Sequence, residues 1–224
     1  MSHPVVPTNK GLSVSHRFST LRPLLVLGVA AIALAGCDRN PLIVKRSPCP
    51  AVAAPFYTND LTLFYPGTAP DAANVDLVAT ITNVRESCVE GDAQLTGSAR
   101  YDVIARRTAT AGPRSLAMPV FASVVQGGNL VVSKQVGQVK LEFPTGQARA
   151  QASGSATAVV SRAAASIPAE IQQIINRKRK PGDPDAAVDP LADPQVRAAL
   201  RAATFERLVG FQLSEAQLAY NVTK

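Results

Sequence analysis

Alternation between two kinds of side chain, with a period of two residues, runs through the middle of the chain. Residues 75–82 and 95–106 place an apolar or small side chain at every second position, with few exceptions. Because successive side chains of a strand point to opposite faces of a sheet, each run predicts a half-buried strand. Residues 116–125 are almost continuously apolar, which is typical of a strand covered on both faces, although Pro119 favours an edge strand or a bulge there.

The strand predicted over 130–143 follows a turn at 126–129 and changes parity along its length. Its first apolar residues lie at even positions, and its last ones, up to Phe143, lie at odd positions. One extra residue near Gly137 reconciles the two halves, so we predict a β-bulge there. Residues 147–160 alternate between small and polar side chains, which predicts a strand with a small inner face despite the high alanine content.

Helical spacing replaces alternation after residue 166. The isoleucines over 167–175 follow i, i+4, i+7, i+8 spacing with Pro168 in the first turn, which predicts a short amphipathic helix. A linker rich in proline, glycine and aspartate leads to Asp193 and Pro194, an N-cap and first-turn proline that predict a second helix. Strand parity returns over 205–213, and residues 214–217 form a capping box for a C-terminal helix.

These elements together predict a mainly β fold. We count about seven strands, which indicates an immunoglobulin-like antiparallel β-sandwich with a helical insertion near 167–203 and a short C-terminal helix. A partly open barrel is the alternative architecture. The single sandwich domain is expected to span residues 56–224.

The first 36 residues have the three parts of an export signal. Lys10, Arg17 and Arg22 form a positive region without an acidic residue, and residues 24–34 are uncharged and apolar. This apolar run is too short to cross about 30 Å of hydrocarbon, which takes about 20 helical residues. We therefore expect residues 1–36 to be a signal peptide that is removed.

Leu34-Ala35-Gly36-Cys37 ends this segment and resembles the lipobox of bacterial lipoproteins. The resemblance implies that the chain is cut before Cys37 and that lipid on this residue holds the protein at a membrane, facing the periplasm. A thiolate is the nucleophile that thioether formation requires, and two or more acyl chains make anchoring stable. The alternatives are an ordinary signal peptide with an incidental cysteine, or a buried helix of the fold.

Asp38 bears on which membrane holds the chain. It resembles the residue that retains such lipoproteins in the inner membrane of enteric bacteria. The inner membrane is therefore slightly favoured, and the outer membrane is the alternative.

Removal of the signal peptide changes the composition decisively. His3 and His16 are the two histidines of the chain, so residues 37–224 contain none, and the chain has no tryptophan. The formal charge falls from +7 to +4 because three basic residues are lost. So mild a basic excess does not indicate a nucleic-acid partner, and an exported protein rarely meets one.

Residues 37–55 are rich in proline and small residues, as expected of a tether. Besides Cys37, residues 37–224 contain two cysteines, and the first of them lies in this tether. Cys49 and Cys88 are expected to form a structural disulfide, because an isolated pair in an oxidising periplasm is usually bridged. Closing a loop of about forty residues stabilises a fold by roughly 3–4 kcal/mol in the chain-entropy model. A redox or nucleophilic role is less favoured, because there is no C-x-x-C motif and no histidine to activate a thiolate.

Two segments of the mature chain resemble a family of alphaproteobacterial envelope lipoproteins. They are 79–84 with Cys88, and above all 208–221, with the sequence LVGFQLSEAQLAYN. The resemblance extends over most of the chain from Cys49 onward and implies an envelope location without a known activity. The helix–linker–helix at 167–203 departs from the family pattern and is interpreted as an elaboration.

No catalytic residue, cofactor or metal-ligand set is predicted for residues 37–224. The absence of histidine excludes Ser–His–Asp and Cys–His pairs and removes the commonest transition-metal ligand. Nucleophile-elbow, P-loop and dinucleotide-binding motifs are also missing from the sequence. Carboxylates near strand ends are expected to be solvated; these are Asp60, Asp71, Asp76, Glu86, Glu90 and Asp92.

A basic cluster follows the first predicted helix and consists of Arg177, Lys178, Arg179 and Lys180. It is a candidate contact for anionic phospholipid, lipopolysaccharide or another acidic envelope polymer. A solvated helix end, where cations complement the helix dipole, is the favoured alternative.

Three functions fit these observations. The first is a lipid-anchored, non-enzymatic protein that binds another envelope protein or an anionic polymer, or has a structural role. The second is a carrier of an apolar ligand or lipid between the sheets, for which the alanine-rich strand would leave room. The third and least favoured is a hydrolase that uses carboxylates alone, because glycan-binding sandwiches usually stack sugars on aromatic rings and this chain has few.

Overall fold

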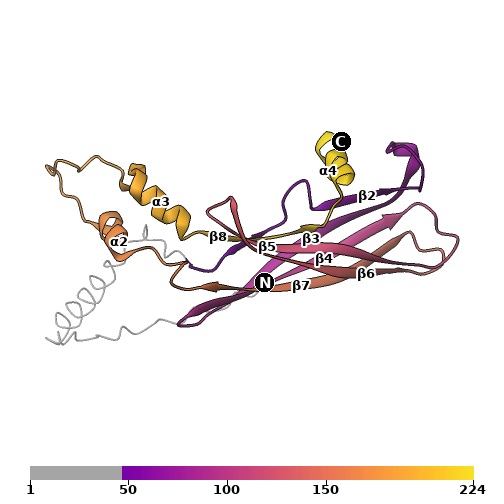
Figure 1. Cartoon of the computed structure of the whole chain (residues 1–224), viewed down its shortest axis with the longest axis horizontal. Helices are drawn as coiled ribbons and strands as arrows, with labels where there is room; N and C mark the ends of the chain where they lie inside the picture. The colour runs from indigo at the N-terminus through magenta and orange to yellow at the C-terminus, as the bar shows by residue number, and fades with distance from the viewer. Residues whose placement is uncertain (1–46) are drawn as a thin grey trace, which may run out of the picture. The chain divides into compact units, whose positions relative to one another are not determined.

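Two four-stranded β-sheets form a sandwich in the computed structural model, which describes residues 47–224 (Figure 1). One sheet has the order β1-β8-β5-β6 and the other β2-β3-β4-β7. The strands are β1 (Ala51–Ala53), β2 (Asp60–Phe64), β3 (Val75–Glu90), β4 (Gln94–Arg107), β5 (Arg114–Gln126), β6 (Leu130–Phe143), β7 (Arg149–Ser161) and β8 (Phe205–Phe211). The helices are η1 (Ala72–Asn74), α2 (Ala169–Asn176), η2 (Pro190–Ala192), α3 (Pro194–Ala202) and α4 (Glu215–Thr223).

The connectivity is that of a Greek key. β4 and β5 are consecutive strands of opposite sheets, and the later strands β7 and β8 pair antiparallel with β4 and β5 respectively. Immunoglobulin-like sandwiches share this arrangement. The predicted β-sandwich is therefore confirmed, with eight strands in residues 47–224 rather than about seven.

The interior is divided into two apolar clusters by an arginine. The larger cluster includes Val209, and the smaller one includes Phe205, both on β8. Arg207 lies between them on the same inner face and is only 1% exposed. Its guanidinium packs against Gly97 of β4, where a Cβ atom would collide with it. Arginine is almost never fully buried without a partner, so this position is unusual.

The strand predicted from the alternation at 147–160 is confirmed as β7. β7 pairs with β4 over thirteen residues, and its alanines and Gly154 lie on the inner face. Small side chains on this face leave room for long ones from the facing strands, such as Arg207 and Tyr101. The two-residue period therefore decides the structure over the intrinsic helical preference of alanine.

Of the helices between β7 and β8, α3 begins as predicted, whereas α2 begins at Ala169 with Pro168 as its N-cap residue rather than in its first turn. Asp193 caps α3 by accepting a hydrogen bond from the backbone N–H of Gln195, and Pro194 occupies the first turn. At the C-terminal helix α4, Ser214 and Gln217 exchange both hydrogen bonds of a capping box. Each helix in the described residues is too short or too polar to span a bilayer.

The β-bulge predicted near Gly137 is wrong in position. β6 passes Gly137 in unbroken register with β5, and the extra residue is Val132, between the paired residues Val131 and Ser133. The first nine residues of β6 are all exposed. The positions of its early apolar residues therefore did not indicate which face of the strand packs on the core. Sequence parity locates a bulge only when both halves of a strand are buried on one side.

The tether predicted over 37–55 is too long at its C-terminal end. β1 pairs in parallel with β8, Ala51 with Glu206, and the neighbouring Pro50 is fully buried. A strand of three residues is too short to show alternation, and its partner lies more than 150 residues away in the sequence. The sandwich therefore begins near Cys49 rather than at residue 56.

Pro119 lies in a central strand, between β8 and β6, but at the point where β8 ends. Its carbonyl accepts the hydrogen bond of the Gln212 backbone N–H, just after the last residue of β8. In an antiparallel strand the N–H and C=O of one residue point to the same side. The N–H that proline lacks would therefore point past the end of the β8 pairing, which explains why the strand tolerates it.

Candidate binding site on the outer face of the second sheet

A β-bulge in β3 shapes the outer face of the β2-β3-β4-β7 sheet. Thr82 pairs with Asp102 and Arg85 pairs with Arg100, so two residues of β3 stand opposite one residue of β4. Asn83 is the first of these two and has a φ of 53°. It is the sole residue other than glycine with positive φ in 47–224, and asparagine adopts this left-handed region more readily than most side chains.

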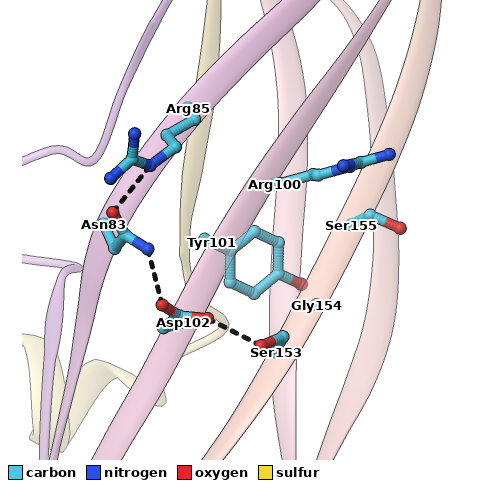
Figure 2. Close-up of a pocket in the computed structure, with 8 residues that line it drawn as sticks. All are labelled: Asn83, Arg85, Arg100, Tyr101, Asp102, Ser153, Gly154 and Ser155. Carbon is cyan, nitrogen blue, oxygen red and sulfur yellow. Dashed lines mark hydrogen bonds between the residues drawn. The ribbon is translucent and has the colours of Figure 1, made fainter.

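Asn83 connects the bulge to a carboxylate on β4 (Figure 2). Its Nδ2 donates to Oδ2 of Asp102 at 2.7 Å, and its Oδ1 accepts a hydrogen bond from Nε of Arg85 at 2.8 Å. From β7, Oγ of Ser153 donates to Oδ1 of Asp102 at 2.6 Å. Three strands are therefore joined through one carboxylate, both of whose oxygens accept hydrogen bonds.

These contacts lower the pKa of Asp102. The hydrogen bond from Ser153 contributes most, followed by that from Asn83, and the charge of Arg85 adds to them. Hydrogen bonds to the ionised form stabilise it relative to the protonated form. Asp102 is therefore ionised at neutral pH and is a weak base, which is unsuited to general acid–base catalysis.

A hollow of about 400 Å³ lies over this network, lined by Asn83, Arg85, Arg100, Tyr101, Asp102, Ser153, Gly154 and Ser155. Tyr101 and Gly154 are cross-strand partners on the inner face of the sheet, and the tyrosine ring packs there so closely on the glycine that a Cβ would collide with it. Burial raises the pKa of the Tyr101 hydroxyl. The volume is within the range of small-ligand sites.

Two guanidinium groups flank the hollow and are opposed in register. Arg85 is held by Asn83, whereas the Arg100 side chain extends away from Asp102 in Figure 2 and has no ion-pair partner within residues 47–224. The two side chains extend to opposite sides of the hollow in Figure 2. An anionic group bound in the hollow would accept charge-assisted hydrogen bonds from a guanidinium group.

The cysteines that the sequence singles out are placed as follows. Cys37 lies outside the described residues. Cys49 and Cys88 form the predicted disulfide, which joins the segment before β1 to the C-terminal part of β3, with Cα atoms 6.2 Å apart.

The basic cluster at 177–180 is partly neutralised within the chain. Arg177 lies 2.9 Å and Arg179 3.2 Å from carboxylate oxygens of Asp185. Lys178 and Lys180 have no carboxylate partner in residues 47–224. The cluster therefore presents two free cations rather than four.

Four of the six carboxylates considered for catalysis have structural partners, and one of these, Asp76, is buried rather than solvated as expected. Asp76 forms a bidentate ion pair with Arg114, and Asp60 accepts a hydrogen bond from Thr80. Asp71 caps η1 and Glu90 pairs with Arg162. Within residues 47–224, no group of three or more histidine, cysteine or acidic side chains is placed to hold a metal ion.

The space between the sheets bears on the carrier hypothesis. Beside Arg207 and the small residues of β7, the enclosed space amounts to only about 10 Å³. That volume is the lower limit for one water molecule. In this region the small inner face of β7 is filled by side chains from other strands.

The residues of the hollow were not predicted from the sequence. Alternation identifies Arg100 and Ser153 as outward-facing, but their convergence depends on strand pairing. A signal does exist, because the inner face of β3 shifts from odd positions at Leu77 to even positions at Cys88. Such a shift indicates one extra residue between them, which is where Asn83 lies.

No protein family, no curated protein and no solved structure matches this chain.

Proposed function

We propose that the chain is a lipid-anchored protein of the bacterial cell envelope with a non-enzymatic binding role. The observation that carries the anchor is Leu34-Ala35-Gly36-Cys37 at the end of an apolar run. The disulfide supports it, because bridged cysteines are typical of exported proteins. Pairing of Cys49 with Cys88 also leaves Cys37 as the one cysteine of the chain outside the disulfide.

Metabolic labelling tests the anchor. Cells that express the native chain and are fed labelled palmitate should yield a labelled, cleaved protein in the membrane fraction, and Cys37→Ala should yield neither label nor cleavage. A Cys49→Ser/Cys88→Ser double variant is the control, because it removes two thiols but keeps the lipobox. A native chain that takes up no label overturns the proposal.

The binding role is assigned to the hollow between Arg85 and Arg100. A cationic pair beside hydroxyl and amide groups suits a carboxylate or phosphate on a sugar polymer or a protein of the envelope. The single carboxylate in the hollow is held ionised, which favours binding over hydrolysis. Asp38 slightly favours the inner membrane as its place of action, and the outer membrane is the alternative.

An NMR titration tests this site with two defined probes, tetragalacturonate for a carboxylate and inorganic phosphate for a phosphate. Shifts should concentrate at residues 83–85, 100–102 and 153–155 and disappear in Arg85→Gln/Arg100→Gln. Arg106→Gln/Arg149→Gln is the matched control, because these arginines also face each other across strands on the same face, outside the hollow. Equal loss in both variants, or no shift with either probe, would contradict the assignment.

A further inference from the structure

One end of the sandwich, here called the entry end, gathers several segments. It comprises Ser47, where the described chain begins, and the β3–β4 and β5–β6 turns. The disulfide holds Cys49 next to the end of β3, and Ala51 pairs with the first residues of β8. The N–H of Gly127 in the β5–β6 turn donates to the carbonyl of Thr204, directly before β8. Figure 1 shows α3 at the same end.

The β5–β6 hairpin exposes three consecutive apolar residues at the entry end. Leu130, Val131 and Val132 are 58%, 56% and 46% exposed. Neighbouring side chains of a strand point to opposite faces, so the β6 arm of the hairpin exposes apolar side chains on both faces, whereas Val124 and Val125 of the β5 arm are buried. A run of exposed apolar residues is unfavourable in water unless it serves binding.

Two further exposed apolar side chains lie at the entry end, on the other sheet. Val89 and Val159 both pair with Thr96, lie on the outer face of the second sheet near its β3–β4 turn, and are exposed. Cations accompany them, because Lys134 follows the hairpin tip and Arg201 packs against Gly127 in the turn. Lys134 and Arg201 have no carboxylate partner within the described residues.

The helical segment at this end is also slightly cationic. Residues 162–204 contain seven basic and five acidic side chains. The acidic ones include helix caps at Asp189 and Asp193 and the partners of Arg177 and Arg179. The cations left without a carboxylate within the described residues, Lys178, Lys180, Arg197 and Arg201, therefore determine the sign of the charge that the segment presents.

We propose that the entry end docks on the surface of an anionic bilayer, with the β5–β6 hairpin tip inserted among the lipid headgroups. This inference rests on the proposed lipid anchor. Ser47 lies ten positions after Cys37, and a chain of that length reaches at most about 36 Å when extended. So short a connection keeps the hairpin at high local concentration at the membrane, where weak apolar and cationic contacts suffice.

Absence of tryptophan allows a direct test. The mature chain, with its disulfide intact, is coupled through Cys37 to a maleimide lipid in phosphatidylglycerol–phosphatidylcholine vesicles. Val131→Trp provides the reporter, and Val222→Trp on α4 provides the control, because Val222 is 54% exposed against 56% for Val131. Coupling supplies the anchor chemically, so a failure of docking is distinguished from a failure of palmitate labelling in cells.

Docking shifts the fluorescence emission of the Val131→Trp variant to shorter wavelength and makes it subject to quenching by brominated lipid, whereas the emission of Val222→Trp stays unchanged. The shift decreases in pure phosphatidylcholine and when Val132→Ser is added. Absence of a shift in the reporter variant, or an equal shift in both variants, overturns the inference. Unchanged urea midpoints for both tryptophan variants ensure that the comparison concerns folded protein.

Discussion

At the scale of single residues, Asp102 couples the hollow to pH. Its folded-state pKa is below the ordinary value near 4, because Ser153, Asn83 and Arg85 stabilise the carboxylate. A lowered pKa contributes stability that is fully present above the unfolded pKa and is lost as the pH falls through the folded pKa. Loss of stability on acidification below about pH 4 is therefore partly due to Asp102.

We predict that Asp102→Asn reduces the loss of folding stability on acidification. Urea unfolding from pH 6 to pH 2 should show a smaller decrease in the free energy of unfolding for the variant than for the native chain. Ser153→Ala removes the largest contribution and should raise the Asp102 pKa toward its ordinary value in a carboxyl NMR titration. Identical pH slopes for native chain and Asp102→Asn would refute the argument.

Arg207 and Arg107 are both buried but differ in their hydrogen bonds, and this difference leads to a second prediction. Arg207 is 1% exposed, and its Nε and Nη1 have no hydrogen-bond partner within the described residues. Arg107 is 3% exposed, but its guanidinium donates to the carbonyls of Gln147 and Pro144 and packs on the ring of Phe143. Burial lowers the pKa of Arg207, and the charge of Glu86 offsets only part of this effect.

Arg207→Met should therefore stabilise the fold, by about 1–3 kcal/mol, because it replaces an unsatisfied charge with an apolar chain of similar length. Arg107→Met should destabilise it by about 1–3 kcal/mol, because it removes two hydrogen bonds from a charged donor, to the carbonyls of Gln147 and Pro144. Urea unfolding of both variants measures the two effects. Destabilisation by Arg207→Met would mean that the cation is compensated by a contact beyond those described.

At the scale of elements, the packing of β4 against β7 depends on a tyrosine–glycine pair. The Tyr101 ring occupies the space that a side chain at position 154 would need. We predict that Gly154→Ala destabilises the fold by about 1–3 kcal/mol through overpacking. In a Tyr101→Leu background the same substitution should cost less, and a thermodynamic cycle of the four proteins measures the difference. Equal costs in both backgrounds would exclude the contact as the cause.

Elements whose side chains meet a core were predictable from the sequence. Alternation located β4 and β7, and the caps at Asp193 and Ser214 located the starts of α3 and α4. The bulge in β6 was misplaced because the first half of that strand is exposed on both faces. The strand β1 has too few residues for a pattern and is defined by its pairing with β8.

The residues of the candidate site could be predicted from the sequence only in part. Sequence reasoning identified outward-facing residues of β4 and β7, but the hollow forms only when Asn83, Asp102 and Ser153 are brought together by the register of three strands. Side-chain hydrogen bonds of this kind depend on pairing between residues about 20 to 50 positions apart in the chain. A single sequence shows which face each residue occupies, and the pairing decides its neighbours.

At the scale of the whole molecule, the disulfide secures the place where the chain enters the sandwich. Cys49 and Cys88 are 39 residues apart in the sequence, and a loop of that length corresponds to roughly 3–4 kcal/mol in the chain-entropy model. β1 follows Cys49 directly and is paired with β8 over only three residues. Without the disulfide, so short an edge strand has little to hold it in place.

We therefore predict two separable effects for Cys49→Ser/Cys88→Ser. The free energy of unfolding in urea should fall by roughly 3–4 kcal/mol, because the unfolded chain gains freedom. Amide hydrogen exchange at residues 51–53 should accelerate far more than exchange in β4, because β1 detaches locally before the sandwich unfolds. Uniform acceleration across both strands would mean that the disulfide stabilises only through the unfolded state. A local effect at β1 would instead show that the disulfide between Cys49 and Cys88 keeps the first strand in its sheet.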